Sequence, residues 1–198
     1  GAGGLTVLAA ILAAQKDIEL HYYADDAFAP YGSLPVLDMQ QRVISICQYL
    51  IDAGVSALVI ACNTATLETI TLVRNLPVVQ GKAVHIIGIE PAIKPASLLP
   101  RLGQEEQGVI SVLATPVTCN SARLKALMEQ NQRLSHVDGS IVSLRYQCIA
   151  SAMLANAIDA MPASIELVKQ ELQRIKSEMQ RVNSRILVLA CENDAYPA

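Results

Sequence analysis

Short aliphatic runs alternate with longer amphipathic stretches along most of the chain. The run SALVIA at residues 56–61 is typical, because it is continuous, apolar and short enough for a buried strand. Gly54 stands where the preceding amphipathic helix should end. The pattern predicts strands over residues 18–24, 56–61, 85–89, 109–114, 141–145 and 185–190. It predicts helices over residues 4–15, 34–53, 65–75, 91–98, 116–130, 148–158 and 162–182.

This alternation predicts an α/β fold of open, mostly parallel sheets with helices on both faces. The best boundary lies in residues 80–91, so we expect two similar half-domains, 1–90 and 91–198. A short internal repeat supports this division: LVIAC at residues 58–62 resembles LVLAC at residues 187–191. Each copy would place a cysteine just beyond the carboxyl end of a strand, where open α/β sheets bind ligands. Buried strands use few residue types, so the alternative that the two segments are similar by chance stays open.

Composition and charge narrow the functional classes. Of the 198 residues, 52% are hydrophobic and 17% are charged, which excludes a disordered chain. The net charge of −3 comes without a basic run, so a nucleic-acid partner is not expected. No apolar stretch is long enough to span a bilayer, and no signal peptide is visible. We therefore expect a cytoplasmic protein without a membrane partner.

The cysteines are odd in number and form no CxxC pair, so neither a zinc finger nor a disulfide framework is indicated. His21, His85 and His136 match no metal-ligand spacing, so no metal site is expected. In a reducing compartment most of the cysteines should be small buried hydrophobes. The five are Cys47, Cys62, Cys119, Cys148 and Cys191.

Cys62 differs from the others because the sequence NTATLE follows it, which suits the start of a helix. Asn63 or Thr64 is expected to cap that helix by accepting free backbone N–H groups. A thiol at a helix N-terminus has a lowered pKa, because the helix dipole favours the thiolate. The same N–H groups are able to hold a carboxylate. The position therefore suits a base or a nucleophile.

If the two half-domains face each other across a cleft, Cys62 and Cys191 lie on opposite sides of one ligand. That arrangement suits stereoinversion at a carbon next to a carboxylate. One thiolate removes the α-proton from one face, and the opposing thiol delivers a proton to the other. Neighbouring hydrogen-bond donors would stabilise the charge that develops on the carboxylate. Hydrolysis by a cysteine nucleophile is disfavoured, because no histidine motif places a base near Cys62.

Five segments carry a resemblance to a known family. They read GAGGL at residues 1–5, DDAFAPYG at 25–32, ACNTAT at 61–66, GIEPAIKPA at 88–96 and ATPVT at 114–118. Together they resemble the glutamate racemases of the aspartate/glutamate racemase family. The resemblance implies a cofactor-independent isomerase with two α/β domains facing each other across a cleft. It would interconvert L- and D-glutamate and supply D-glutamate for peptidoglycan.

Carried over by position, the resemblance implies that Cys62 and Cys191 are the two catalytic acid/base thiols. The ligand would be a small amino acid, glutamate, with no cofactor, and a homodimer is left open. Asp25 would either bind substrate indirectly or cap a turn. Thr118 is favoured as the substrate contact of the second domain. The full set of implied substrate-binding residues is Pro30, Tyr31, Gly32, Asn63, Thr64, Thr115 and Thr118.

The sequence also departs from the family. Family members read Gly-Cys-Thr-His around the second cysteine, whereas this chain reads ACEN at residues 190–193. Glu192 would disfavour a thiolate on Cys191 and repel a dicarboxylate. The family's first strand and its Asp-Ser pair do not appear before Gly1. Either segments are missing from the sequence, or the chain is a divergent homologue with a weakened second half-site.

Two functional alternatives stay open beside glutamate racemisation. The first is racemisation of aspartate or another amino acid, although GIEPAIKPA favours glutamate. The second is an impaired homologue that binds an amino acid without turnover.

Overall fold

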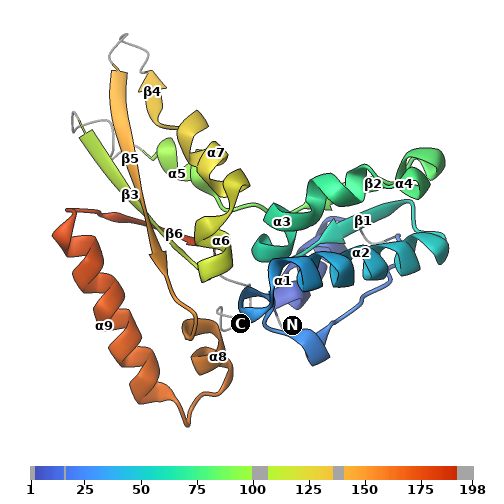
Figure 1. Cartoon of the computed structure of the whole chain (residues 1–198), viewed down its shortest axis with the longest axis horizontal. Helices are drawn as coiled ribbons and strands as arrows, with labels where there is room; N and C mark the ends of the chain where they lie inside the picture. Colours follow the sequence, from blue (N-terminus) through green and yellow to red (C-terminus); the bar gives the residue numbers. More distant parts are fainter. Residues whose placement is uncertain (1–2, 16, 100–106, 136–140, 191–198) are drawn as a thin grey trace. The chain divides into compact units, whose positions relative to one another are not determined.

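The computed structural model describes residues 3–15, 17–99, 107–135 and 141–190 (Figure 1). The chain divides into two compact units, the first ending at Glu90 and the second beginning at Pro91. Each unit contains its own sheet with parallel strands. The predicted α/β class with parallel sheets is therefore confirmed.

The first unit is built on two parallel strands, β1 (Ala57–Ile60) and β2 (His85–Gly88). Residues Met39, Val43, Cys47 and Ile51 recur every four positions and form the buried face of one long helix. This face packs against the helix that follows β1. The helices and 3₁₀ turns of the unit are α1 (Gly3–Ala14), η1 (Asp26–Phe28), η2 (Tyr31–Ser33), α2 (Val36–Asp52), α3 (Asn63–Arg74) and α4 (Pro77–Lys82).

The second unit is built on a four-stranded sheet with the order β4-β5-β3-β6. Strands β5, β3 and β6 are parallel, with Val112 opposite both Cys148 and Val188, and β4 is antiparallel to β5. The strands are β3 (Gln107–Ala114), β4 (Arg133–Ser135), β5 (Ile141–Ala150) and β6 (Ile186–Ala190). The helices are α5 (Ile93–Ser97), α6 (Pro116–Asn120), α7 (Ala122–Gln130), α8 (Leu154–Asp159) and α9 (Ile165–Arg181).

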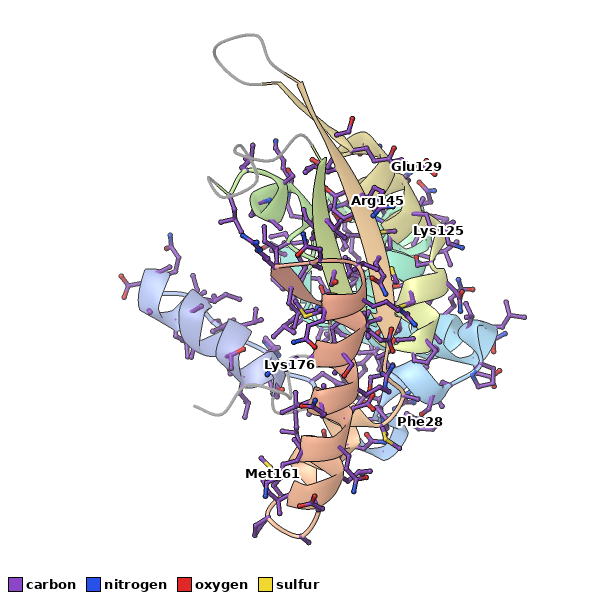
Figure 2. The ribbon with its side chains drawn as sticks, turned by 90° about the vertical axis from the view of Figure 1, so that its left-hand side faces the viewer. Phe28, Lys125, Glu129, Arg145, Met161 and Lys176 are labelled. Carbon is purple, nitrogen blue, oxygen red and sulfur yellow. The ribbon has the colours of Figure 1, made fainter. Side chains whose placement is uncertain are left out.

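Helices α8 and α9 cover one face of this sheet. The core between them contains Leu113 of β3, Ile149 of β5 and Leu154 of α8, with Val168 and Ile175 of α9. Figure 2 shows α9 lying along the sheet and labels the exposed Lys176 on it. None of the helices within the described ranges is long and apolar enough to cross a membrane.

The strand predicted over residues 18–24 is wrong. This segment has no regular secondary structure, and no strand of the described chain pairs with it. Its alternation of apolar and polar residues suits a strand, but a strand also needs a hydrogen-bonded neighbour. Ile18, Leu20 and Tyr22 are accordingly exposed.

Two helix predictions in the second unit also need correction. The helix predicted over residues 116–130 is two helices, separated by Ser121 in an extended conformation. The Asn120 side chain donates a hydrogen bond to the carbonyl of Pro116. In a regular helix that carbonyl accepts from the backbone N–H of Asn120, so the side chain competes with the helix. The helix predicted over residues 148–158 begins later, as α8 at Leu154, because β5 continues to Ala150 in register with β3. The short elements α4 and β4 were not predicted.

Candidate functional site

Cys62 lies between β1 and α3, just past the carboxyl end of the strand, as predicted. Its side chain is partly exposed. The sulfur itself caps the helix by accepting a hydrogen bond of 3.4 Å from the backbone N–H of Ala65. The prediction that Asn63 or Thr64 caps the helix is therefore wrong. Extended φ and ψ angles at Cys62 place its own side chain over the free N–H groups.

Thr66 holds the start of α3 against the ends of both strands. Its hydroxyl donates to the carbonyl of Ile60 at 3.1 Å and accepts from the backbone N–H of Ile89 at 3.2 Å. A Cβ at Gly88 would lie 2.4 Å from the Thr66 methyl group, so only glycine allows this close approach. The backbone that presents Cys62 is thus fixed by side-chain contacts as well as by the sheet.

The turn η2 carries Tyr31 and packs against α3. The Tyr31 hydroxyl donates a hydrogen bond of 2.6 Å to Asp25. Pro30 and Gly32, which flank it, are half-buried. Burial and Asp25 raise the pKa of the Tyr31 hydroxyl well above its usual value, and negative charge on Cys62 adds to the shift. Tyr31 and Cys62 therefore share one electrostatic environment.

Asp25 is held by a two-pronged ion pair with Arg42 of α2. The Nη2 atom of Arg42 lies 2.6 Å from Oδ1 of Asp25, and its Nε atom donates to Oδ2 at 2.9 Å. The hydrogen bond from Arg42 holds the pKa of Asp25 below its usual value. The guanidinium also lies 4.5 Å from the centre of the Phe28 ring. Asp25 thus links η1, η2 and α2 through side-chain contacts.

Arg42 is a residue that sequence reasoning missed. It stands on a long amphipathic helix and belongs to no recognisable motif. Position does give one signal, because α2 begins directly after the PYG turn and its first turns must pass close to that turn. A positive charge there is a natural partner for the carboxylate of Asp25.

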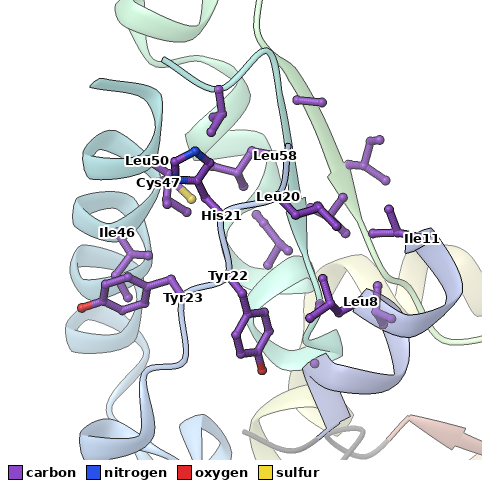
Figure 3. Close-up of a pocket in the computed structure, with 18 of the residues that line it drawn as sticks. Leu8, Ile11, Leu20, His21, Tyr22, Tyr23, Ile46, Cys47, Leu50 and Leu58 are labelled. Carbon is purple, nitrogen blue, oxygen red and sulfur yellow. The ribbon is translucent and has the colours of Figure 1, made fainter. Parts of the chain in front are cut away.

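A pocket of about 830 Å³ opens beside β1 within the first unit. Figure 3 shows Leu8 and Ile11 of α1, Leu20 and Tyr22 of the segment before η1, and Leu58 of β1 around it. Most of its wall is aliphatic. Its polar lining groups include Asp25, Tyr31 and Cys62. The structure thus brings the predicted thiol and the predicted tyrosine to one pocket.

The other predicted substrate contacts of the first unit stand at the start of α3. Asn63 and Thr64 are its first two residues, directly after Cys62. Both side chains are buried, with Thr64 fully inaccessible to solvent. Both residues are next to the thiol in the sequence, but their side chains are packed within the first turn of α3. Their role in binding stays a prediction.

The predicted contacts of the second unit, Thr115 and Thr118, form a local cap at the start of α6. The Thr115 hydroxyl oxygen accepts from the N–H of Thr118 at 3.3 Å, and the two hydroxyl oxygens lie 3.1 Å apart. Both residues are buried. Cys191 follows β6 in the sequence and lies outside the described residues. Within the described ranges, no three His, Cys, Asp or Glu side chains are placed to hold a metal ion.

No family model matches the chain. Among curated relatives, the glutamate racemase of Cupriavidus pinatubonensis is 41% identical over 128 residues, which cover 65% of this chain and 43% of that protein. The glutamate racemase of Ectopseudomonas mendocina is 33% identical over 169 residues, which cover 85% of this chain and 59% of that protein. The chain thus spans about half the length of the curated relatives it matches.

Solved structures with the same fold include a complex of Escherichia coli glutamate racemase with L-glutamate and the activator UDP-MurNAc-Ala. It has a TM-score of 0.71 and 23% sequence identity, and the match covers 98% of this chain and 66% of that one. A complex of the Francisella tularensis glutamate racemase with D-glutamate gives a TM-score of 0.68 at 23% identity, again over 98% of this chain and 66% of that one. These likenesses support the two-unit α/β fold.

Proposed function

Because the chain is a homologue of the glutamate racemases, we propose that the protein interconverts L- and D-glutamate without a cofactor. The observation that carries the proposal is the place of Cys62. It lies at the carboxyl end of β1, at the start of α3, with a backbone N–H directed at its sulfur. A backbone N–H at the start of a helix stabilises a thiolate by its hydrogen bond and by the helix dipole.

The proposed reaction is a proton exchange at the α-carbon of the amino acid. Cys62 as thiolate removes the α-proton from one face, and a second thiol protonates the opposite face. We assign the second thiol to Cys191, which follows β6 as Cys62 follows β1. After one turnover Cys62 is a thiol and the second cysteine is a thiolate, so the reverse reaction starts from this product state. This assignment requires the two half-domains, 1–90 and 91–198, to face each other across a cleft.

Binding of the substrate is assigned to groups around the start of α3 and the start of α6. In the first unit these are Tyr31 with its neighbours Pro30 and Gly32, and Asn63 and Thr64. Backbone N–H groups at the start of a helix are suited to the α-carboxylate. In the second unit Thr115 and Thr118 supply hydroxyl groups, which would hold the other end of the ligand.

The cellular role follows from the reaction. D-Glutamate from this enzyme would enter peptidoglycan synthesis in the cytoplasm, and a homodimer is compatible with this role. Racemisation of aspartate or another amino acid is the nearest alternative, because it uses the same thiols and a different side-chain contact.

One sequence feature favours a second candidate function, binding without turnover. Glu192 stands next to Cys191, where the family has a threonine. A negative charge there disfavours the thiolate and repels a dicarboxylate. In that case the first half-site would still hold an amino acid.

Exchange of the α-proton tests the proposal directly. The full chain is incubated with L-glutamate and separately with D-glutamate in deuterated water, and both the α-proton signal and the circular dichroism are followed. We expect loss of the α-proton and inversion from either enantiomer, and a rate at least about 100-fold lower in Cys62→Ser. Cys148→Ser is the matched control, because it makes the same change at a partly exposed cysteine of β5 in the second unit.

The outcomes separate the candidates. Glutamate binding in calorimetry without α-proton exchange would support binding without turnover. Exchange with aspartate in place of glutamate would move the proposal to the related racemases. Wild-type protein that neither binds nor exchanges either amino acid would overturn it.

A further inference from the structure

We propose that Cys119 and Cys148 form a dithiol site that reacts with small-molecule disulfides to give an intramolecular disulfide. Both cysteines belong to the second unit, and both are partly exposed. Neither has a role in the proposed racemisation. The inference therefore stands or fails independently of the proposed function.

The register of the sheet brings the two residues together. Cys148 lies on β5 opposite Val112 of β3, two residues before Ala150, which pairs with Ala114. Cys119 lies on α6, which follows β3 and packs against β5. Its sulfur lies 3.9 Å from the carbonyl oxygen of Ala114, directly beside β5. The cysteines are distant in the chain but adjacent at this end of the sheet.

The alternation of side chains along β5 also supports this juxtaposition. Ile149 is fully buried in the core that the sheet shares with α8 and α9. Because successive residues of a strand face opposite sides of the sheet, Cys148 faces away from that core. On that side the Cys119 thiol is placed to interact with the Cys148 side chain. A disulfide between them requires the two sulfurs to approach to about 2.05 Å.

The surroundings make Cys148 the attacking group. The hydrogen bond from Cys119 lowers its pKa, and the positive charge of Lys125 on α7 acts in the same direction. Figure 2 shows Lys125 and Glu129 on α7. A thiol with a lowered pKa and some exposure to solvent is the reactive kind, whereas burial raises the pKa of Cys47 to about 11.

The reaction proceeds by two exchanges with oxidised glutathione. The Cys148 thiolate attacks one sulfur of the disulfide, which forms a mixed disulfide and releases one glutathione thiolate. Cys119, losing its proton, then attacks the sulfur of Cys148 and releases the second glutathione. The two protein thiols are oxidised, and one glutathione disulfide is reduced to two thiols. The product ties α6 to β5.

Peptide mapping tests the site. The reduced full chain is incubated with oxidised glutathione, its remaining thiols are blocked, and the protein is digested with trypsin without reduction. Cleavage places Cys119 in the peptide 102–123 and Cys148 in the peptide 146–169, and the other cysteines fall in other peptides. We expect a cross-linked pair of these two peptides that disappears on reduction.

Variants assign the order of attack. Cys119→Ser should leave a stable glutathione adduct on Cys148, and Cys148→Ser should abolish the cross-link. Cys47→Ala, which changes only the buried cysteine of α2, should keep it. Wild-type protein in which the peptides 102–123 and 146–169 stay reduced, or each carry glutathione without a cross-link, would overturn the proposal. The wild-type result decides the question even if a variant fails to fold.

Discussion

The hydroxyl of Tyr31 donates a hydrogen bond of 2.6 Å to Asp25, whose carboxylate also holds the guanidinium of Arg42. The three side chains come from a turn, a loop end and a long helix. Their contacts fix η2 between α2 and the start of α3. The residue expected to touch the substrate is thus also a structural link.

Tyr31→Phe should therefore weaken the fold as well as any ligand binding. The variant removes a half-buried hydrogen bond to a charged acceptor, so we expect a loss of about 1 to 2 kcal/mol in the free energy of unfolding. Urea unfolding followed by far-UV circular dichroism measures it. Tyr49→Phe is the control, because Tyr49 is 64% exposed. Equal midpoints for the two variants would contradict the structural role of the Tyr31 hydroxyl.

Asp25 should make the stability of the chain depend on pH. Its pKa is lowered in the folded state, chiefly by the hydrogen bond from Arg42. Its contribution is therefore complete above its unfolded pKa of about 4 and is lost as the pH falls through the lower folded value. We expect wild type to exceed Asp25→Asn in stability at neutral pH, and the difference to shrink in strong acid.

Urea midpoints measured from neutral pH down to about pH 2 follow this difference. Asp52→Asn is a control at neutral pH, because its side chain is 60% exposed and its ion pair with Lys82 is worth little. A difference between wild type and Asp25→Asn that stays constant down to the lowest pH would contradict the linkage.

The alternation of apolar runs was enough to predict most of the fold. The parallel strands β1, β2, β3 and β6 were predicted within two residues at each end, because each combines a continuous apolar run with a clear boundary. The segment at residues 18–24 shows the limit of this reasoning. Its own pattern suits a strand, but pairing depends on which neighbours surround it in space.

The site was predictable to the extent that it is local in sequence. Cys62 was placed correctly because a strand end and a helix start flank it. The ion pair of Asp25 with Arg42 was not predicted, since it joins separate elements and no local pattern encodes it. The sulfur of Cys62 as helix cap was missed for another reason, because thiols are rare among capping groups.

Gly88→Ala should destabilise the first unit. The new Cβ would lie 2.4 Å from the methyl group of Thr66 and 2.5 Å from the end of the Ile70 side chain. The Ile70 side chain is able to rotate away from the new Cβ. The Thr66 side chain is held by its two hydrogen bonds, so α3 must shift. We expect a loss of about 1 to 3 kcal/mol in the free energy of unfolding, measured by urea denaturation.

Gly81→Ala is the matched control for this substitution. No atom lies within 4 Å of the new Cβ, and alanine favours the helical conformation of α4. The free energy of unfolding should be unchanged or should rise by up to about 1 kcal/mol. A Gly88→Ala protein as stable as Gly81→Ala would show that the contact with Thr66 does not constrain α3.

Thr66→Val should loosen the junction that presents Cys62. Valine keeps the shape of threonine but neither donates to Ile60 nor accepts from Ile89, and the site is fully buried. We expect a loss of about 1 to 2 kcal/mol in the free energy of unfolding. We also expect somewhat faster hydrogen exchange at the Ile89 amide, which keeps only its bond to the carbonyl of Ile60.

Two comparisons isolate the hydroxyl of Thr66. Thr66→Ser keeps the oxygen and should preserve protection of the Ile89 amide, even though loss of the buried methyl group lowers overall stability. Thr71→Val removes a hydroxyl from an exposed position of the same helix and should change neither measurement. Rapid amide exchange in the serine variant would mean that the methyl packing of Thr66, and not its hydrogen bonds, holds α3 against the ends of the two strands.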